Sequence, residues 1–109
     1  VYVSDRGNHR IQIFDPQGKF LRKWGNRGGG DGAFSQPQGL AIDGDGNVYV
    51  SEYGNDRIQV FAPQGRFLRK WGGKGSEDGQ FSQPEGLAID CGGKVYVSDH
   101  WNDPLSTSP

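Results

Sequence analysis

Cationic and aromatic side chains recur at the tips of three similar segments, where they could hold an anionic or flat ligand. The acid, the asparagine and the arginine of the first two segments recur at matching positions, whereas two intervening positions vary. Guanidinium groups and aromatic rings are suited to stacking on nucleobases or to gripping a peptide. We therefore predict a ligand-binding face for RNA or protein, formed by the varied residues. They are Arg6, His9, Tyr53, Asp56, His100 and Trp101.

The recurring residues of these segments have a simpler, structural explanation. Asparagine closes turns with its own side chain, which accounts for Asn8 and Asn55. Arg10 and Arg57 each follow an acid by five residues, so we expect them to form ion pairs within their own repeat. These four residues are therefore predicted to be structural.

Two glycine-rich segments, 25–36 and 72–83, carry Arg27 and Lys74 at matching positions. Glycine-rich loops can cradle phosphate, but neither segment has the lysine motif or the strand-loop-helix context of a P-loop. We interpret both as flexible crossover loops, with Arg27 and Lys74 as secondary ligand contacts.

The residues that could support catalysis or metal binding are few. Catalytic zinc needs about three protein ligands, and the chain offers His9 and His100, two repeats apart, and the single Cys91. Asp43-Gly-Asp45-Gly-Asn47 resembles the start of a calcium loop but lacks its later ligands, so a hairpin turn explains it better. For this stretch of chain we predict no catalytic residue, no metal site and no cofactor, and therefore no enzyme; the prediction does not extend to a full-length parent.

An internal repeat organises the chain. Val1-Tyr-Val-Ser returns at Val48 and at Val95, and Phe34-Ser-Gln-Pro returns at Phe81, always at an offset of 47 residues. About two thirds of the positions in 1–47 are identical in 48–94. A repeat of this length indicates one supersecondary unit per period.

Each period has the pattern of strands rather than helices. Runs rich in valine, isoleucine and aromatic residues lie between Gly, Pro, Asn and Asp. The complete copy predicts strands at 39–43, 48–52, 57–61 and 67–71, with small residues in the first strand and charges in the last. Four antiparallel strands in about 47 residues are typical of a β-propeller blade.

We therefore predict an all-β fold, a fragment of a β-propeller with about two blades of four antiparallel strands each. The predicted units are strands and crossover at 1–36, a complete repeat at 37–83, the start of a third repeat at 84–103 and a divergent tail at 104–109. The tail is not expected to continue as a strand. Because propellers need four to eight blades, we expect further blades from a longer parent chain or from self-association.

Composition narrows the possible partners. Twelve basic and thirteen acidic residues give a net charge of −1, which argues against a strongly basic nucleic-acid-binding domain. No apolar run approaches the roughly 20 residues of a membrane-spanning helix, so no membrane partner is expected. The single cysteine excludes an internal disulfide framework and is compatible with a reducing compartment such as the cytoplasm.

Residues 40–68, which include Leu-Ala-Ile-Asp-x-x-Gly-Asn-Val-Tyr-Val-Ser-Glu and Asn-x-Arg-Ile-Gln-Val-Phe, closely resemble the NHL repeat. Asn8-His9-Arg10 matches a common form of its turn, and the resemblance continues through Asp103. After Asp103 it is lost, because Pro104 stands where Arg10 and Arg57 stood. The resemblance implies a propeller, usually six-bladed, that serves as a binding platform.

The resemblance implies several functional hypotheses. NHL repeats occur in tripartite-motif ubiquitin ligases, where they recruit protein or RNA, and in bacterial and secreted proteins as interaction or sensor domains. A non-catalytic platform for protein or single-stranded RNA is the favoured hypothesis, and the resemblance extends it to the substrate-recognition part of such a ligase. The alternatives are a zinc enzyme similar to the peptidyl-amidating lyase and a purely structural or sensor segment.

Overall fold

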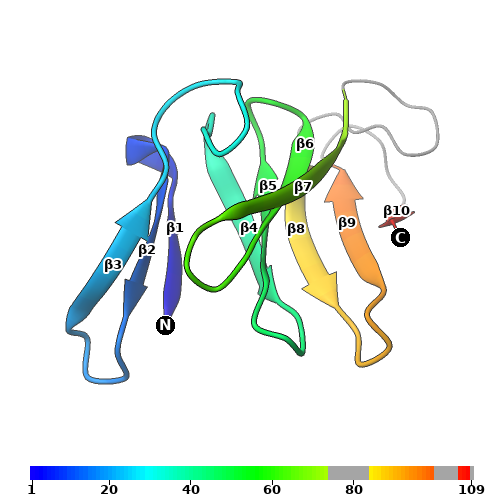
Figure 1. Ribbon diagram of the computed structural model, residues 1–109. Coiled ribbons are helices and arrows are strands. Elements are labelled where there is room, and N and C mark those ends of the chain that lie inside the picture. The colour runs from blue at the N-terminus through cyan, green and yellow to red at the C-terminus, as the bar shows by residue number, and fades with distance from the viewer. Residues whose placement is uncertain (74–83, 100–105, 109) are drawn as a thin grey trace.

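The computed structural model describes residues 1–73, 84–99 and 106–108, which form three antiparallel β-sheets (Figure 1). The first sheet has the order β1-β2-β3, the middle sheet β4-β5-β6-β7, and the third sheet β10-β9-β8. Neighbouring strands of each sheet are also neighbours in the sequence, as in a meander. The three sheets follow one another at the predicted 47-residue spacing.

The first sheet contains β1 (Tyr2–Asp5), β2 (Arg10–Phe14) and β3 (Phe20–Trp24), with a short 3₁₀ helix η1 (Arg6–Asn8) after β1. The middle sheet contains β4 (Pro37–Ile42), β5 (Val48–Glu52), β6 (Arg57–Phe61) and β7 (Phe67–Gly72). The third contains β8 (Pro84–Ile89), β9 (Val95–Asp99) and β10 (Ser106–Ser108). Among the described residues, only the middle sheet has the four strands predicted for a blade, and the other two sheets have three strands each.

The tail departs from its prediction, because Ser106–Ser108 is a strand. It pairs with β9 through Ser106↔Val97, Thr107↔Tyr96 and Ser108↔Val95. This register repeats that of the middle sheet, where Gln59 lies opposite Val50 at the same 47-residue offset. Strand pairing uses backbone groups, so the register persists although the tail has lost the apolar sequence of the earlier copies.

Two hydrophobic clusters hold the sheets face to face. Val48, Val50 and Phe61 of the middle sheet pack against Ile11 and Phe34. On the opposite face, Tyr49, Ile58 and Val60 pack against Val95 and Val97 of the third sheet. Alternate residues of β5 thus serve two different neighbours, which is the period-two geometry of a strand buried on both faces. Burial of both faces explains why β5 and β6 are buried along their whole length.

β4, the first strand of the complete repeat, lies innermost, as its small residues predicted. β4 lies beside β8 and also contacts β1, so these strands meet where the sheets converge. Gly86 shows why small residues are needed there, because a Cβ atom at this position would lie 2.8 Å from the Ser98 hydroxyl. β4 begins at Pro37 rather than at the predicted residue 39, with a register shift between Pro37 and Leu40.

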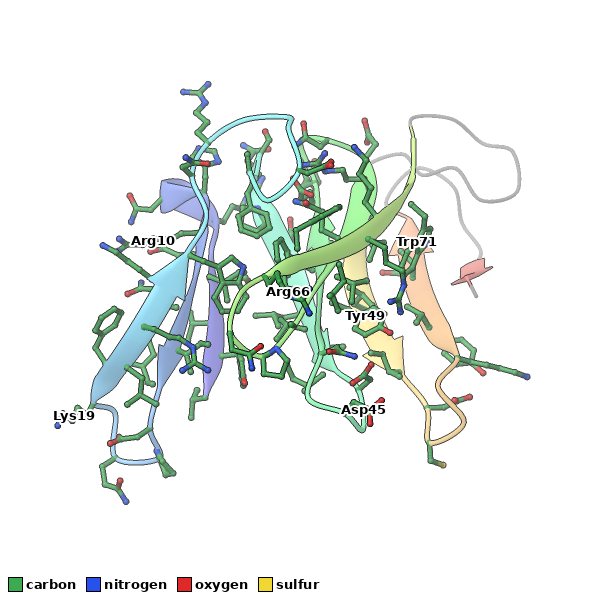
Figure 2. All side chains as sticks on the ribbon, in the orientation of Figure 1. Arg10, Lys19, Asp45, Tyr49, Arg66 and Trp71 are labelled. Atoms are coloured by element: carbon green, nitrogen blue, oxygen red, sulfur yellow. The ribbon has the colours of Figure 1, made fainter. Side chains whose placement is uncertain are left out.

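The connections divide between two edges of the molecule. The hairpin that follows β2, the one after β4 and the one after β8 lie at one edge, whereas η1, the turn after β5 and the crossover loop 25–36 lie at the other (Figure 1). Lys19 and Asp45 mark the hairpin edge (Figure 2). No helix among the described residues has the length and apolar character needed to cross a membrane.

Candidate binding rim

We call the edge formed by η1, the turn 53–56 and the crossover loop 25–36 the crossover rim. Both turns end in a non-glycine residue with left-handed backbone geometry, His9 at φ 54° and Asp56 at φ 51°. Asn, Asp and His tolerate this conformation better than other non-glycine residues. The sequence variation between His and Asp at this position therefore preserves the shape of the turn.

The structure brings together two of the predicted ligand-binding residues. The guanidinium carbon of Arg6 lies 4.8 Å from the centre of the Tyr53 ring. These residues occupy the same position in successive repeats, so the tip of one repeat lies on the tip of the next. Arg6 is exposed and Tyr53 is half-buried. The pair forms a continuous cationic and aromatic surface across the boundary between two sheets.

His9 takes part in a contact that the sequence did not predict. Its Nδ1 atom accepts a hydrogen bond from the backbone N–H of Gln36 at 3.0 Å. Gln36 directly precedes β4, and its carbonyl accepts the N–H of Tyr53 at 3.0 Å. The half-buried imidazole therefore links the first sheet to the start of the middle one, a structural role beside its predicted place on the ligand-binding face.

The other predicted contact residues are distributed unevenly. Asp56 is half-buried at the end of its turn, and Arg27 is exposed on the crossover loop, where it bridges to Phe34 through the backbone. His100, Trp101 and Lys74 lie outside the described residues. The described part of the predicted face thus consists of Arg6, His9, Tyr53, Asp56 and Arg27.

Beneath this surface, the crossover loop is held by a cluster of polar residues that we call the cradle. It consists of the buried Glu52, Arg57 and Gln59 and the half-buried Asn55. Arg57 Nε donates to Glu52 Oε2 at 2.6 Å, with 9 % of the arginine side chain and none of the glutamate side chain exposed. The predicted ion pair between these residues is confirmed. Gln59 also donates to Glu52, at 2.7 Å.

The cradle binds backbone groups of the loop. The remaining nitrogens of Arg57 donate to the carbonyls of Gly29, Gly30 and Ala33 at 2.7–2.9 Å. Gln59 donates to the Ala33 carbonyl and accepts the N–H of Gly32. A planar guanidinium with five donors suits such a set of carbonyls, because its fork geometry is fixed.

Segment 25–36, which the sequence predicted to be a flexible crossover, is therefore held to the middle sheet by hydrogen bonds. Asn55 donates to the carbonyl of Gly28 at 3.0 Å and to Glu52 at 2.7 Å, and these bonds tie the turn to the loop. Close packing reinforces the bonds: a Cβ atom at Gly54 would overlap the Ser35 side chain, and one at Gly25 would overlap the Phe34 ring.

Sequence reasoning assigned Arg57 and its acid to an ion pair but missed Gln59 and the loop carbonyls. A signal was present, because Gln12 and Gln59 occupy the same position in both copies. A repeated polar residue within an otherwise apolar strand indicates a buried hydrogen-bonding role. The loop carbonyls left no such signal, since backbone groups are common to all residues.

At the opposite, hairpin edge, Asp43 is fully engaged by its own turn. Its Oδ1 accepts the N–H groups of Asp45 and Asn47 at 2.9 Å, and its Oδ2 accepts the Asn47 side chain and the Tyr49 hydroxyl. Burial acts to raise the pKa of Asp43, but these donors outweigh it and lower that pKa below the ordinary value. Burial also raises the pKa of Tyr49. The predicted hairpin turn thus accounts for this acid.

Within the described parts of the chain, no group of three or more His, Cys, Asp or Glu residues is placed to hold a metal ion. A cavity of about 270 Å³ lies beside the cradle, lined by Asn55, Arg57, Lys70, Trp71, Gly72 and Gly73. Its two cationic side chains already have partners, since Lys70 pairs with Asp31 at 2.6 Å and Arg57 binds the loop. This cavity therefore offers little unsatisfied charge to a ligand.

Comparison with known proteins matches this architecture to a family. Residues 34–61 and 81–103 match the family model described as NHL repeat. This chain contains NHL repeats. A segment of 41 residues is 44 % identical to RING finger protein nhl-1 of Caenorhabditis elegans, covering 38 % of this chain and 4 % of that protein.

Solved structures show the same fold over nearly the whole chain. A protein of unknown function from Bacteroides thetaiotaomicron has a TM-score of 0.79 at 17 % identity, covering 98 % of this chain and 32 % of its own. Streptogramin B lyase gives 0.70 at 14 %, covering 99 % and 36 %. The hydrazine synthase of Kuenenia stuttgartiensis gives 0.69 at 20 %, covering 90 % and 25 %.

These likenesses establish the fold alone. The NHL repeats form a segment of a β-propeller, as the sequence predicted, and the chain spans a quarter to about a third of the solved structures it matches. The sequence identities to these three structures are 20 % or lower. The shared fold therefore does not assign the chemistry of the two named enzymes to this chain.

Proposed function

We propose that this chain is a non-catalytic binding module whose crossover rim binds a protein partner. NHL repeats are commonly protein-binding, and similarity to a RING finger protein is compatible with substrate recognition in a ubiquitin ligase. The observation that carries the proposal is the Arg6–Tyr53 contact, which joins two varied repeat tips above a cradle whose residues recur.

The chemistry of the rim favours a partner segment that carries carboxylates. Arg6 and Arg27 are both exposed, and a guanidinium binds carboxylate in a bidentate manner. Tyr53 adds a flat, half-buried ring, and Tyr and Arg are enriched among residues that dominate protein interfaces. The net charge of −1 gives less support to RNA, whose affinity depends largely on phosphate contacts.

A selection experiment tests the proposal. A displayed library of random twelve-residue peptides is selected on the 109-residue chain, and the affinities of the enriched peptides are measured by fluorescence anisotropy. We expect acidic peptides whose binding falls about tenfold or more in Arg6→Ala and in Arg27→Ala, as for interface hot spots. Arg66→Ala, which removes an exposed arginine from the turn between β6 and β7, is the matched control.

Two outcomes contradict the proposal. Peptides that lose affinity equally in Arg66→Ala would show charge attraction without a rim site. If no peptide is enriched but a labelled 15-nucleotide RNA of random sequence binds with a steep salt dependence, RNA is the ligand instead.

A further inference from the structure

The side chain of His9 joins the turn of the first sheet to the start of the middle sheet through one acceptor atom. Its Nδ1 lies 3.0 Å from the backbone nitrogen of Gln36 and accepts that N–H. A neutral imidazole has one acceptor nitrogen and one donor nitrogen, whereas an imidazolium has two donors. The contact therefore requires a neutral ring that carries its proton on Nε2.

Gln36 is held in a backbone conformation that glutamine rarely adopts. Its φ is 54°, in the left-handed region. Its N–H is bound to His9, and its carbonyl accepts the N–H of Tyr53 at 3.0 Å. Strained backbone persists only where the surrounding contacts impose it. Loss of the His9 acceptor would therefore remove one of these two restraints and let Gln36 relax.

The charged and titratable groups of the elements around His9 give little support to a positive ring. They are Asp5, Arg6 and Arg10 on its own side, Arg27 on the crossover loop, and Glu52, Tyr53 and Asp56 at and beside the facing turn. Asp5 already accepts three side-chain hydrogen bonds at 3.0–3.1 Å, and Glu52 is paired with Arg57. Among the described residues, His9 is in no ion pair.

We propose that His9 is a pH-sensitive switch at the junction of the first and middle sheets, whose protonation releases the Gln36 N–H and loosens the start of β4 together with turn 53–56. Histidine ordinarily changes its charge between about pH 5 and pH 8. Toward the upper end of this range, the neutral ring accepts the bond. Toward the lower end, a proton on Nδ1 would place two donors against each other.

The sign of the effect on stability follows from the same bond. The unfolded chain can protonate His9 without losing any contact, whereas the folded chain loses the bond to Gln36. Stability therefore rises with pH wherever the unfolded chain binds more protons than the folded one. The switch is a property of the chain alone, so it does not depend on whether the crossover rim binds a protein.

The middle repeat provides a comparison at the matching position. Asp56 has the same left-handed geometry as His9, with φ values of 51° and 54°. Among ordinary side chains, only histidine has its change of charge between about pH 5 and pH 8. The exchange of aspartate for histidine between the two repeats thus assigns sensitivity to mild acid to the first of them.

Amide exchange in the intact 109-residue chain, followed by NMR, tests the proposal. Rates are measured at about pH 7.5 and about pH 5.5, on either side of the ordinary histidine value, and each is divided by that of an unstructured peptide at the same pH. Protection of the Gln36 amide should fall about fivefold at the lower pH, the factor for one ordinary hydrogen bond. Protection of Tyr53 should fall with it, whereas Val60 in β6 is the internal control.

His9→Asn is the matched variant. Asparagine tolerates left-handed geometry, and its side-chain oxygen accepts a hydrogen bond at every pH. The variant should keep the protection of Gln36 at both pH values, and its urea midpoint should change less between them than that of the unaltered chain. His100→Asn removes the other histidine of the sequence and should leave the effect of pH in place.

The imidazole itself can be observed in the unaltered chain, which keeps the test decisive if a variant does not fold. At the higher pH, the nitrogen-15 shifts of His9 should show a bare Nδ1 and a protonated Nε2. A proton on Nδ1 at that pH would overturn the proposal. So would unchanged protection of Gln36 at the lower pH, or an equal loss of protection in a folded His9→Asn chain, which would assign the effect of acid to another group.

Discussion

Matching sets of four polar residues occur in the first and middle sheets, with aspartate as the acid in the first set and glutamate in the second. Among the described residues, only the middle set is covered by a loop. In the first sheet, Asp5 Oδ2 accepts hydrogen bonds from Asn8, Arg10 and Gln12 at 3.0–3.1 Å. Side-chain exposure is 30 % for Arg10 and 22 % for Asp5, against 9 % and 0 % for Arg57 and Glu52. Local sequence thus suffices to form the ion pair, whereas its burial requires the crossover loop.

This comparison separates formation of an interaction from its contribution to stability. An ion pair in contact with water is screened and adds little. A buried pair becomes essential once formed, because removing one member leaves an uncompensated charge. The two sheets therefore provide an internal control for the energetic role of the loop.

The largest expected effect is on Arg57. Arg57→Ala should lower the free energy of unfolding by about 3–5 kcal/mol, the usual cost of breaking a buried pair, because it leaves Glu52 buried and frees three loop carbonyls. Arg10→Ala should cost far less. Urea unfolding followed by tryptophan fluorescence measures both, with Arg57→Lys as a variant that keeps the charge. Equal losses at the two arginines would show that the loop does not create the difference.

Packing of the loop should give the next largest effect. Gly54→Ala places a methyl group against Ser35 and should cost about 1–3 kcal/mol, as overpacking usually does. Gly7→Ala adds the same methyl group where nothing lies within 4 Å, and should be close to neutral. Thermal unfolding of the two variants checks this difference; similar melting temperatures would contradict the close contact.

The junction between the two turns should contribute less. Arg6 and Tyr53 should show a coupling energy of about 0.5–1 kcal/mol, typical of an exposed cation–π pair. A double-mutant cycle with Arg6→Ala and Tyr53→Ala, read by urea unfolding, gives this value. The contact is disproved in solution if the two single effects simply add.

Lowering the pH should slightly reduce the stability that the polar residues of the first sheet, which no loop covers in the described part of the chain, give to the fold. Hydrogen bonds from Asn8 and Arg10 lower the pKa of Asp5 below its ordinary value of 3.8. Its ionised form therefore stabilises the fold above that value, and this contribution is lost as the pH falls through the lowered pKa. Asp5→Asn should flatten the decline in stability between about pH 5 and pH 2, measured by urea unfolding. An unchanged slope would argue against the hydrogen bonds.

Much of the fold was predictable because the sequence contains the same pattern of strands and turns in two successive repeats. The ranges predicted at 48–52 and 57–61 coincide with β5 and β6, since turn residues bound both strands closely. β10 was missed because its sequence lacks the apolar alternation, and only the backbone register of β9 identifies it. The predicted division into units at 1–36, 37–83, 84–103 and 104–109 stays a prediction.

The site was less predictable, because its main contacts cross the boundary between sheets. The bond from Gln36 to His9 and those from Arg57 to the glycine carbonyls join residues more than 20 positions apart. Residue types alone do not reveal such partners. The sequence did identify the varied tips, and whether Arg6, Tyr53 and Arg27 contact a ligand stays a prediction.

The fastening of loop 25–36 onto the middle sheet has a consequence for how such a chain can grow. The loop follows the last strand of one repeat and binds the cradle of the next, so the loop and its binding residues belong to different repeats. Tandem gene duplication in whole periods copies both together, wherever its breakpoints fall, and the new junction fits without redesign. An insertion inside the loop would move its carbonyl groups away from the cradle. We therefore expect repeats to differ in length at the hairpins of the opposite edge instead.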